Sequence, residues 1–215
     1  MAGKRRNQRA GDMQQLLSLM QKLVVATPPA QTRKRRKRKR NNKAPPRTSE
    51  EGSITISRTE MLTELKALKA SAATGHVDLT PDSFSFLKGL AKSFDHVKWV
   101  KLNIFYKPAV GTSFGGLVSF GIDWDWSTPA GADRKKISAL TPNVSFAAWS
   151  DTQAKPLALP VSKLQAMPWY SPTATSWPLK GPGKLHWSAA AVTEDRVVGE
   201  LWASYTVKMT GTNPS

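Results

Sequence analysis

The sequence contains no cysteine, so neither a disulfide framework nor a thiolate metal site can form. The absence of disulfides fits a reducing compartment. Long apolar runs are lacking too, and none approaches the ~20 residues of a membrane-spanning helix. The apolar stretch at residues 16–26 is interrupted by Ser18, Gln21 and Lys22 and leads to two prolines rather than a small-residue cleavage site. We therefore expect neither a secretory signal nor a membrane partner.

Aromatic and acidic residues are missing from the N-terminal part of the chain. All eight Trp, three Tyr and seven Phe lie between Phe84 and Tyr205. Residues 1–47 hold fifteen Lys or Arg and a single acid, Asp12, a net charge of +14. Residues 48–215 hold seventeen bases and fourteen acids, a net charge of +3. The strong basicity of the chain therefore belongs to its first quarter.

This uneven distribution predicts two parts. A segment with dense like charge and no aromatic side chain cannot bury enough apolar surface to offset its ordering entropy. We predict that residues 1–50 form a disordered basic arm and that residues 51–215 form one domain. Inside the arm, apolar residues from Leu16 to Val24 recur at helical spacing after a potential Asp12 cap. They predict either an unstructured arm or a short helix that forms only against a partner.

The arm contains eight consecutive basic residues, Arg33 to Arg40. Each base that neutralises a nucleic-acid phosphate releases a counterion, so we expect RNA binding that salt reverses. No aromatic residue is interleaved, so contacts with the backbone and no readout of base sequence are expected. A nuclear import signal is the alternative use of such a run. The predicted RNA-binding residues are Lys4, Arg5, Arg6, Arg9, Arg33, Lys34, Arg35, Arg36, Lys37, Arg38, Lys39, Arg40, Lys43 and Arg47.

Alternating apolar and polar residues predict several strands in the domain. Val100, Leu102, Ile104 and Tyr106 share one face of the first, and residues 199–209 alternate over their whole length. Further strands are predicted at residues 114–126, 184–192 and, near an edge because of its prolines, 156–162. Many strands joined by irregular Pro, Gly and Ser connections favour an antiparallel sandwich or barrel.

One helix is well signalled inside the domain. Thr80 is the predicted cap, Pro81 takes the first position, and the predicted buried side chains are those of Phe84, Leu87, Ala91 and Phe94. Residues 54–68 give conflicting signals. They begin as a strand, Ile54-Thr-Ile-Ser, but Met61, Leu62, Leu65 and Leu68 fall at helical spacing. Periodicity alone predicts a helix there.

Five segments in order, a basic arm, ITISRTEMLTEL, PDSFSFLKGLAKSFDHVKWVKLNIFYKP, GTSFGGLVSFGIDWDW and GELWASYTVKM, together resemble the shell domain of a virus coat protein family. That family comprises the small icosahedral plant RNA viruses of the sobemovirus and tombusvirus type. The resemblance covers roughly residues 50–210. It implies an all-β fold, an eight-stranded antiparallel jelly-roll sandwich with one or two short helices, and assigns Ser53–Leu65 to the first long strand. The short chain also fits ourmiaviruses, whose particles are bacilliform.

The resemblance implies a structural capsid protein rather than an enzyme. Its partners would be copies of itself and single-stranded viral RNA, and its location the virion and the host cytoplasm, or the nucleus through the basic run. A cellular RNA-binding or ribosome-associated β-sandwich protein is the alternative function. A jelly-roll lectin is a third, because eight Trp could stack on sugars. A lectin, however, has no use for a segment of charge +14.

Asp123 and Asp125 are the candidate metal ligands, for calcium, with Asp133 a loop away. In the resembling shells, acids after this strand help bind calcium between subunits, and Asn213 loosely matches a C-terminal ligand. We expect both acids on one strand face. The alternatives are solvated or Lys-paired acids beside a turn, and an Asp-x-Asp sugar transferase site, which would require an α/β fold. His76, His96 and His186 have no metal-site spacing and are expected to be surface or strand histidines.

Overall fold

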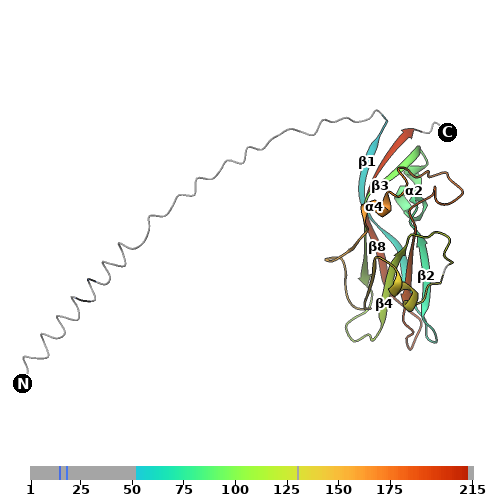
Figure 1. Ribbon diagram of the computed structural model, residues 1–215. Coiled ribbons are helices and arrows are strands. Elements are labelled where there is room, and N and C mark those ends of the chain that lie inside the picture. Colours follow the sequence, from blue (N-terminus) through green and yellow to red (C-terminus); the bar gives the residue numbers. More distant parts are fainter. Residues whose placement is uncertain (1–14, 16–17, 19–51, 130, 213–215) are drawn as a thin grey trace, which may run out of the picture. The chain divides into compact units, whose positions relative to one another are not determined.

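The computed structural model describes Gln15, Ser18, residues 52–129 and residues 131–212 (Figure 1). Gln15 and Ser18 are helical, and the Ser18 hydroxyl donates to the Gln15 carbonyl at 2.9 Å. The rest of the arm predicted at residues 1–50 lies outside the described residues, as does Asn213. The disorder of the arm and its RNA-binding residues therefore stay predictions.

The domain consists of two antiparallel four-stranded sheets that enclose one core (Figure 1). The first sheet has the strand order β1 (Ile54–Ala67), β8 (Arg196–Thr212), β3 (Phe94–Pro108) and β6 (Leu157–Ala158). The second has the order β2 (Ala73–Asp78), β7 (Lys184–Ala189), β4 (Leu117–Asp123) and β5 (Asn143–Ala147). These eight strands in two sheets confirm the predicted all-β jelly-roll sandwich.

β1 is a strand along its whole length, so the helical spacing of its apolar residues was misleading. It pairs with β8 from Ile54, opposite Met209, to Ala67, opposite Arg196. The register shifts between Met61 and Thr63, and again between Leu65 and Lys66. Such irregularities change which side chains point inward, and Met61 is accordingly 45% exposed. Pairing with a distant strand outweighs the local pattern, and the resemblance-based assignment of Ser53–Leu65 is confirmed.

A similar irregularity corrects the prediction for β3. Leu102 and Tyr106 are buried as predicted, but Val100 is 41% exposed. The register with β8 shifts between Trp99 and Lys101, so the inward positions before the shift include Trp99 rather than Val100. The alternation predicted for β8 needs no correction, because the residue left without a partner at this shift is Val100 of β3, whereas Thr206 and Val207 of β8 are both paired. The inward residues 199, 201, 203, 205, 207 and 209 of β8 are all buried.

The helices agree only in part with those predicted from the sequence. The predicted helix is a 3₁₀ turn, η1 (Pro81–Ser83), followed by α2 (Ser85–Ala91), and Phe94 already belongs to β3. The Thr80 side chain does not cap the backbone there. Two short helices were not predicted, α3 (Arg134–Ala139) and α4 (Val161–Leu164). α4 occupies part of the strand predicted at residues 156–162, and β4 and β7 are shorter than predicted.

Glu60 joins β1, β8 and α2 through a buried carboxylate. Glu60 is 8% exposed, and its carboxylate accepts hydrogen bonds from the Tyr205 hydroxyl and, at 2.8 Å, from the backbone N–H of Phe86. The second bond satisfies one of the free N–H groups of the first turn of α2. Burial, followed by the hydrogen bond to Glu60, raises the pKa of Tyr205 above its usual range, so the hydroxyl remains a donor.

We predict that Tyr205→Phe lowers the free energy of unfolding by about 1–3 kcal/mol, because the buried Glu60 carboxylate loses its hydroxyl donor. Urea unfolding of the unassembled protein measures the change. Thr206→Val is the matched control, since the Thr206 hydroxyl bonds Ser57 on the exposed face, at 2.7 Å, and its loss should stay within about 0.5 kcal/mol. Equal stability of the two variants would show that the Glu60 bond contributes little.

Candidate functional site

The two candidate metal ligands lie at the end of β4 but do not share a strand face. β4 ends at Asp123, and Asp125 lies in the turn that follows, so this part of the prediction was wrong. Oδ1 of Asp123 accepts from the N–H of Asp125 at 2.8 Å. Oδ1 of Asp125 accepts from the N–H and the hydroxyl of Ser127 at 2.9 and 2.7 Å. Each acid thus shapes the turn by bonding the backbone two residues on.

Lys184 lies between two acids of the second sheet. In register it stands opposite Asp78 of β2 on one side and Asp123 of β4 on the other. Its ammonium donates to the Thr128 carbonyl at 3.1 Å and so ties β7 to the turn. The hydrogen bonds from Ser127, and to a lesser extent the charge of Lys184, lower the pKa of Asp125. This arrangement fits the alternative interpretation of lysine-paired acids beside a turn.

The same turn offers few ligands for a metal. Asp133 caps α3, because its Oδ1 accepts from the N–H of Lys136 at 2.8 Å. Across residues 52–129 and 131–212, no three His, Asp or Glu side chains come together as a metal-binding group. A calcium ion held by Asp123 and Asp125 would therefore need its remaining ligands from backbone carbonyls, water or a neighbouring copy. Calcium binding stays a prediction.

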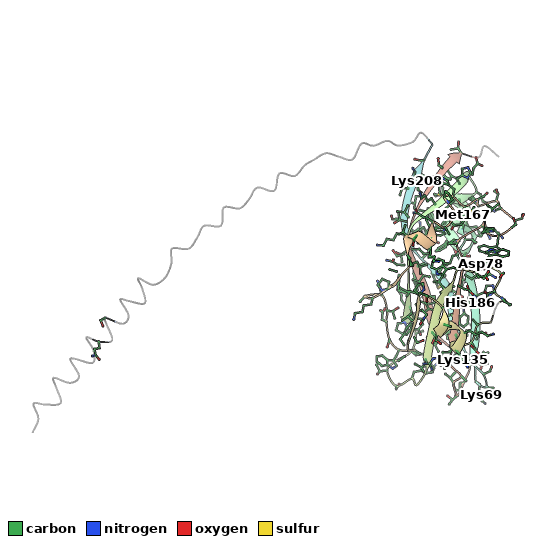
Figure 2. All side chains as sticks on the ribbon, viewed as in Figure 1. Lys69, Asp78, Lys135, Met167, His186 and Lys208 are labelled. Carbon is green, nitrogen blue, oxygen red and sulfur yellow. The ribbon has the colours of Figure 1, made fainter. Side chains whose placement is uncertain are left out.

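The histidines all lie in strands, but the burial of His186 was not foreseen. His186 of β7 (Figure 2) is 0% exposed. It stands opposite His76 of β2, with their ring centroids 6.1 Å apart. Among the described residues, neither ring nitrogen of His186 has a hydrogen-bond partner. α3 packs against β4 and β7 and so covers this side of the second sheet. A helix of six residues gave too short a pattern in the sequence to reveal that cover.

Burial lowers the pKa of His186, an effect reinforced by His76 and Lys184 and opposed by Asp123 and Asp78. The unfolded chain takes up this proton near pH 6.5, before the folded protein does. Because the unfolded state then binds more protons, the free energy of unfolding falls as the pH drops below about 6.5, down to the folded-state pKa. Above about pH 6.5 His186 has no such effect.

We predict that His186→Leu reduces the loss of stability between about pH 7.5 and pH 5.5, because the buried titrating group is gone. Urea unfolding at the two pH values measures it. His96→Gln removes an exposed histidine and serves as the control, with the wild-type pH dependence expected. An unchanged pH dependence in His186→Leu would show that other groups cause the loss.

No helix within the described part of the chain is long and apolar enough to span a membrane. The solved structure of tobacco necrosis virus superposes with a TM-score of 0.66 at 16% identity, covering 75% of this chain and 97% of that one. At this identity the likeness shows the fold alone. Cocksfoot mottle virus gives the same TM-score at 13% identity, covering 75% of this chain and 96% of that one.

Comparison with curated proteins gives a capsid protein of Pothos latent virus (isolate Pigeonpea/India), which is 26% identical over an alignment of 170 residues. The alignment covers 75% of this chain and 45% of that protein. The chain therefore spans less than half the length of this relative. The model of the viral coat protein (S domain) family matches residues 22–215. Since that match covers most of the chain and agrees with the eight-stranded fold, this protein belongs to the viral coat protein (S domain) family.

Proposed function

We propose that this protein is the capsid protein of a plant virus, that it assembles with copies of itself into a closed shell, and that its basic arm packages single-stranded genomic RNA. The match of the coat protein family to residues 22–215 carries the proposal. The curated relative from Pothos latent virus is itself a capsid protein. Members of this family are structural proteins, which agrees with the expectation that the chain is not an enzyme. The protein would then be found in the virion and in the host cell.

Exposed apolar side chains on the domain support self-association. Large hydrophobic and aromatic residues are enriched where proteins meet, because burying them between subunits removes them from water. In the described residues such side chains occur on both sheets, on the helices α2 and α4, and in loops. They are Ile54, Met61, Leu68, Phe86, Val100, Leu117, Trp126, Trp149, Val161 and Leu179. A shell in which each copy contacts several others would bury many of them.

The charge of the chain supports RNA as the cargo. Residues 1–47 carry a net charge of +14, whereas residues 48–215 carry +3. For a single strand, the logarithm of the binding constant falls by ~0.7 per phosphate contact for each unit of log salt, so about ten engaged bases give a slope near 7. Such binding is tight at low salt and independent of RNA sequence, as a protein that packages a whole genome requires.

We predict that deleting residues 1–47 removes most RNA affinity, because the cut takes away fifteen of the 32 basic residues while leaving every described strand. Filter binding of single-stranded RNA over a salt series measures the affinity and its slope. Deleting residues 1–30 is the control, since it keeps Arg33 to Arg40 and most of the affinity should remain. If the longer deletion kept the full RNA affinity and the full salt slope, the arm would not be the source of the RNA affinity.

Shell formation is tested by negative-stain microscopy of the full-length protein mixed with RNA. We expect closed particles, and their shape distinguishes an icosahedral from a bacilliform shell. RNA binding without closed particles would instead favour the alternative function, a cellular RNA-binding protein. That outcome would leave the result of the deletion experiment valid and would reject only the proposed capsid function.

We further propose that Asp123 and Asp125 contribute to calcium sites between subunits. Each uses one oxygen in the turn, which leaves Oδ2 to face a cation, and hard oxygen ligands suit calcium. A neighbouring copy would supply the remaining ligands. Lys184 beside Asp123 weakens such a site, and the carboxylates must outweigh its charge.

We predict that a chelator at neutral pH swells the particles, because the carboxylates then repel across the interface, and that added calcium reverses the swelling. Sedimentation velocity measures the change. The variant Asp123→Asn, Asp125→Asn should form particles that no longer respond to the chelator. Asp151→Asn, another exposed turn acid, is the control and should respond as wild type does. Unchanged chelator sensitivity in the double variant would exclude these two residues from the site.

A further inference from the structure

The two sheets each end in a short strand on the same side of the sandwich. In the described part of the chain, β6 is the last strand of the first sheet and β5 the last of the second. A pocket of about 150 Å³ lies between them, lined by Val144 of β5 and Leu157 of β6 among others. Phe120, a fully buried core residue, also lines the pocket, which therefore reaches from the surface toward the core. This side of the domain, residues 143–157, is called the β5–β6 edge.

The pocket has the size and the lining that an aromatic side chain requires. An apolar cavity of about 150 Å³ is large enough to bind benzene. An indole can therefore place its six-membered ring inside and keep its N–H among polar groups at the rim. Pro156 completes the apolar lining, and the polar groups belong to Asn143, Thr152 and Lys155.

An exposed tryptophan stands on the same edge. Trp149 is 43% exposed and lies in the segment that leads from β5 to β6. The fully buried Tyr106 holds this segment on both sides of the tryptophan. Its hydroxyl donates to the Ala148 carbonyl at 2.7 Å, and its backbone N–H donates to the Thr152 hydroxyl at 2.7 Å. Because the segment is already fixed, covering the ring requires little further ordering of the chain.

Exposed charges of both signs accompany the ring and the pocket. Lys155 lines the pocket, and Asp151 lies earlier in the same segment, where its Oδ1 accepts from the N–H of Gln153 at 2.6 Å. Both charged side chains are exposed. Two copies of the chain that face each other through this edge can place Lys155 of one copy opposite Asp151 of the other. Exposed pairs of this kind add little affinity, but they fix the register of a contact.

We propose that the β5–β6 edge is a contact between two copies of this chain, in which Trp149 of each copy enters the pocket of the other. This contact rests on the proposed function, since a closed shell requires contacts between copies, and it names one of the surfaces involved. A contact across a two-fold axis uses the same patch on both copies, so the patch must complement itself. The β5–β6 edge does so, because it carries a projecting ring, a hollow, an acid and a base. A small apolar ligand would fill the pocket but would leave Trp149 exposed.

The first test changes the projecting ring in the full-length protein mixed with single-stranded RNA. Tryptophan is among the residues that dominate binding energy at interfaces, so Trp149→Ala should raise the protein concentration needed for particles by ~30-fold or more. Trp149→Phe is the matched control and should assemble nearly as wild type, because its ring still fits the pocket. Val144→Trp fills the pocket from within the same copy and should act as Trp149→Ala does. Light scattering measures assembly, and circular dichroism checks that each variant is folded.

The second test locates the contact by crosslinking. The chain contains no cysteine, so a short bis-maleimide joins only cysteines that are introduced. Copies with Asp151→Cys are mixed with tagged copies with Lys155→Cys, and the reagent should join a tagged copy to an untagged one. Lys163→Cys, at an exposed lysine of α4, replaces Lys155→Cys in the control and should give no such product.

The two measurements separate this contact from the capsid function itself. If Trp149→Ala assembled at the wild-type concentration, or if particles formed without the crosslink between positions 151 and 155, the contact would be wrong and the shell would stand. Crosslinked pairs without closed particles would support the contact and reject the shell. Loss of assembly in Trp149→Ala with an unchanged crosslink would place the ring at another surface and overturn its insertion into the pocket.

Discussion

The pairing of β8 with two partner strands is the constraint on which the rest of the domain depends. β8 runs from Arg196 to Thr212 and is hydrogen-bonded to β1 on one side and β3 on the other. Its inward side chains, from Leu201 to Met209, lie in the centre of the core. Because β1 precedes β8 by well over a hundred residues, the chain must close a long loop before this sheet can form. The Glu60–Tyr205 bond and the Lys98–Lys208 pair both exist only in this register.

The sequence predicted the regular parts of this sheet and missed its irregularities. β8 alternates regularly from Gly199 to Met209 and was predicted over that length. β1 and β3 contain shifts of register at Met61/Thr63 and Trp99/Lys101, and there the pattern suggested a helix or the wrong inward residue. Such a shift is set by the partner strand, so local periodicity does not contain it. Only the resemblance to a known family, which includes long-range pairing, assigned β1 correctly.

The strands of the second sheet were harder to predict, and so were the residues around the turn that contains Asp123 and Asp125. β2 and β5 are short and were missed, and β4 has buried residues at every position from Val118 to Ile122. A strand covered on both faces loses the alternation that reveals a strand. The cover over His186 comes partly from α3, whose six residues give no clear period. Asp123 and Asp125 were found from the sequence, whereas the placement of Lys184 between Asp78 and Asp123 required the register.

Two clusters on the outward face of the first sheet show how register decides which side chains meet a lysine beside an indole ring. At one end Lys107 lies 3.9 Å from the centre of the Trp202 ring, and it stands opposite Glu200, whose carboxylate accepts the indole N–H at 2.7 Å. That cluster therefore combines a lysine, an acid and an indole ring. At the other end the residue opposite Lys98 is a second lysine. The contact between an ammonium group and an indole ring thus occurs at both ends of this strand pair, and the register of β3 with β8 decides whether an acid or a second lysine stands opposite.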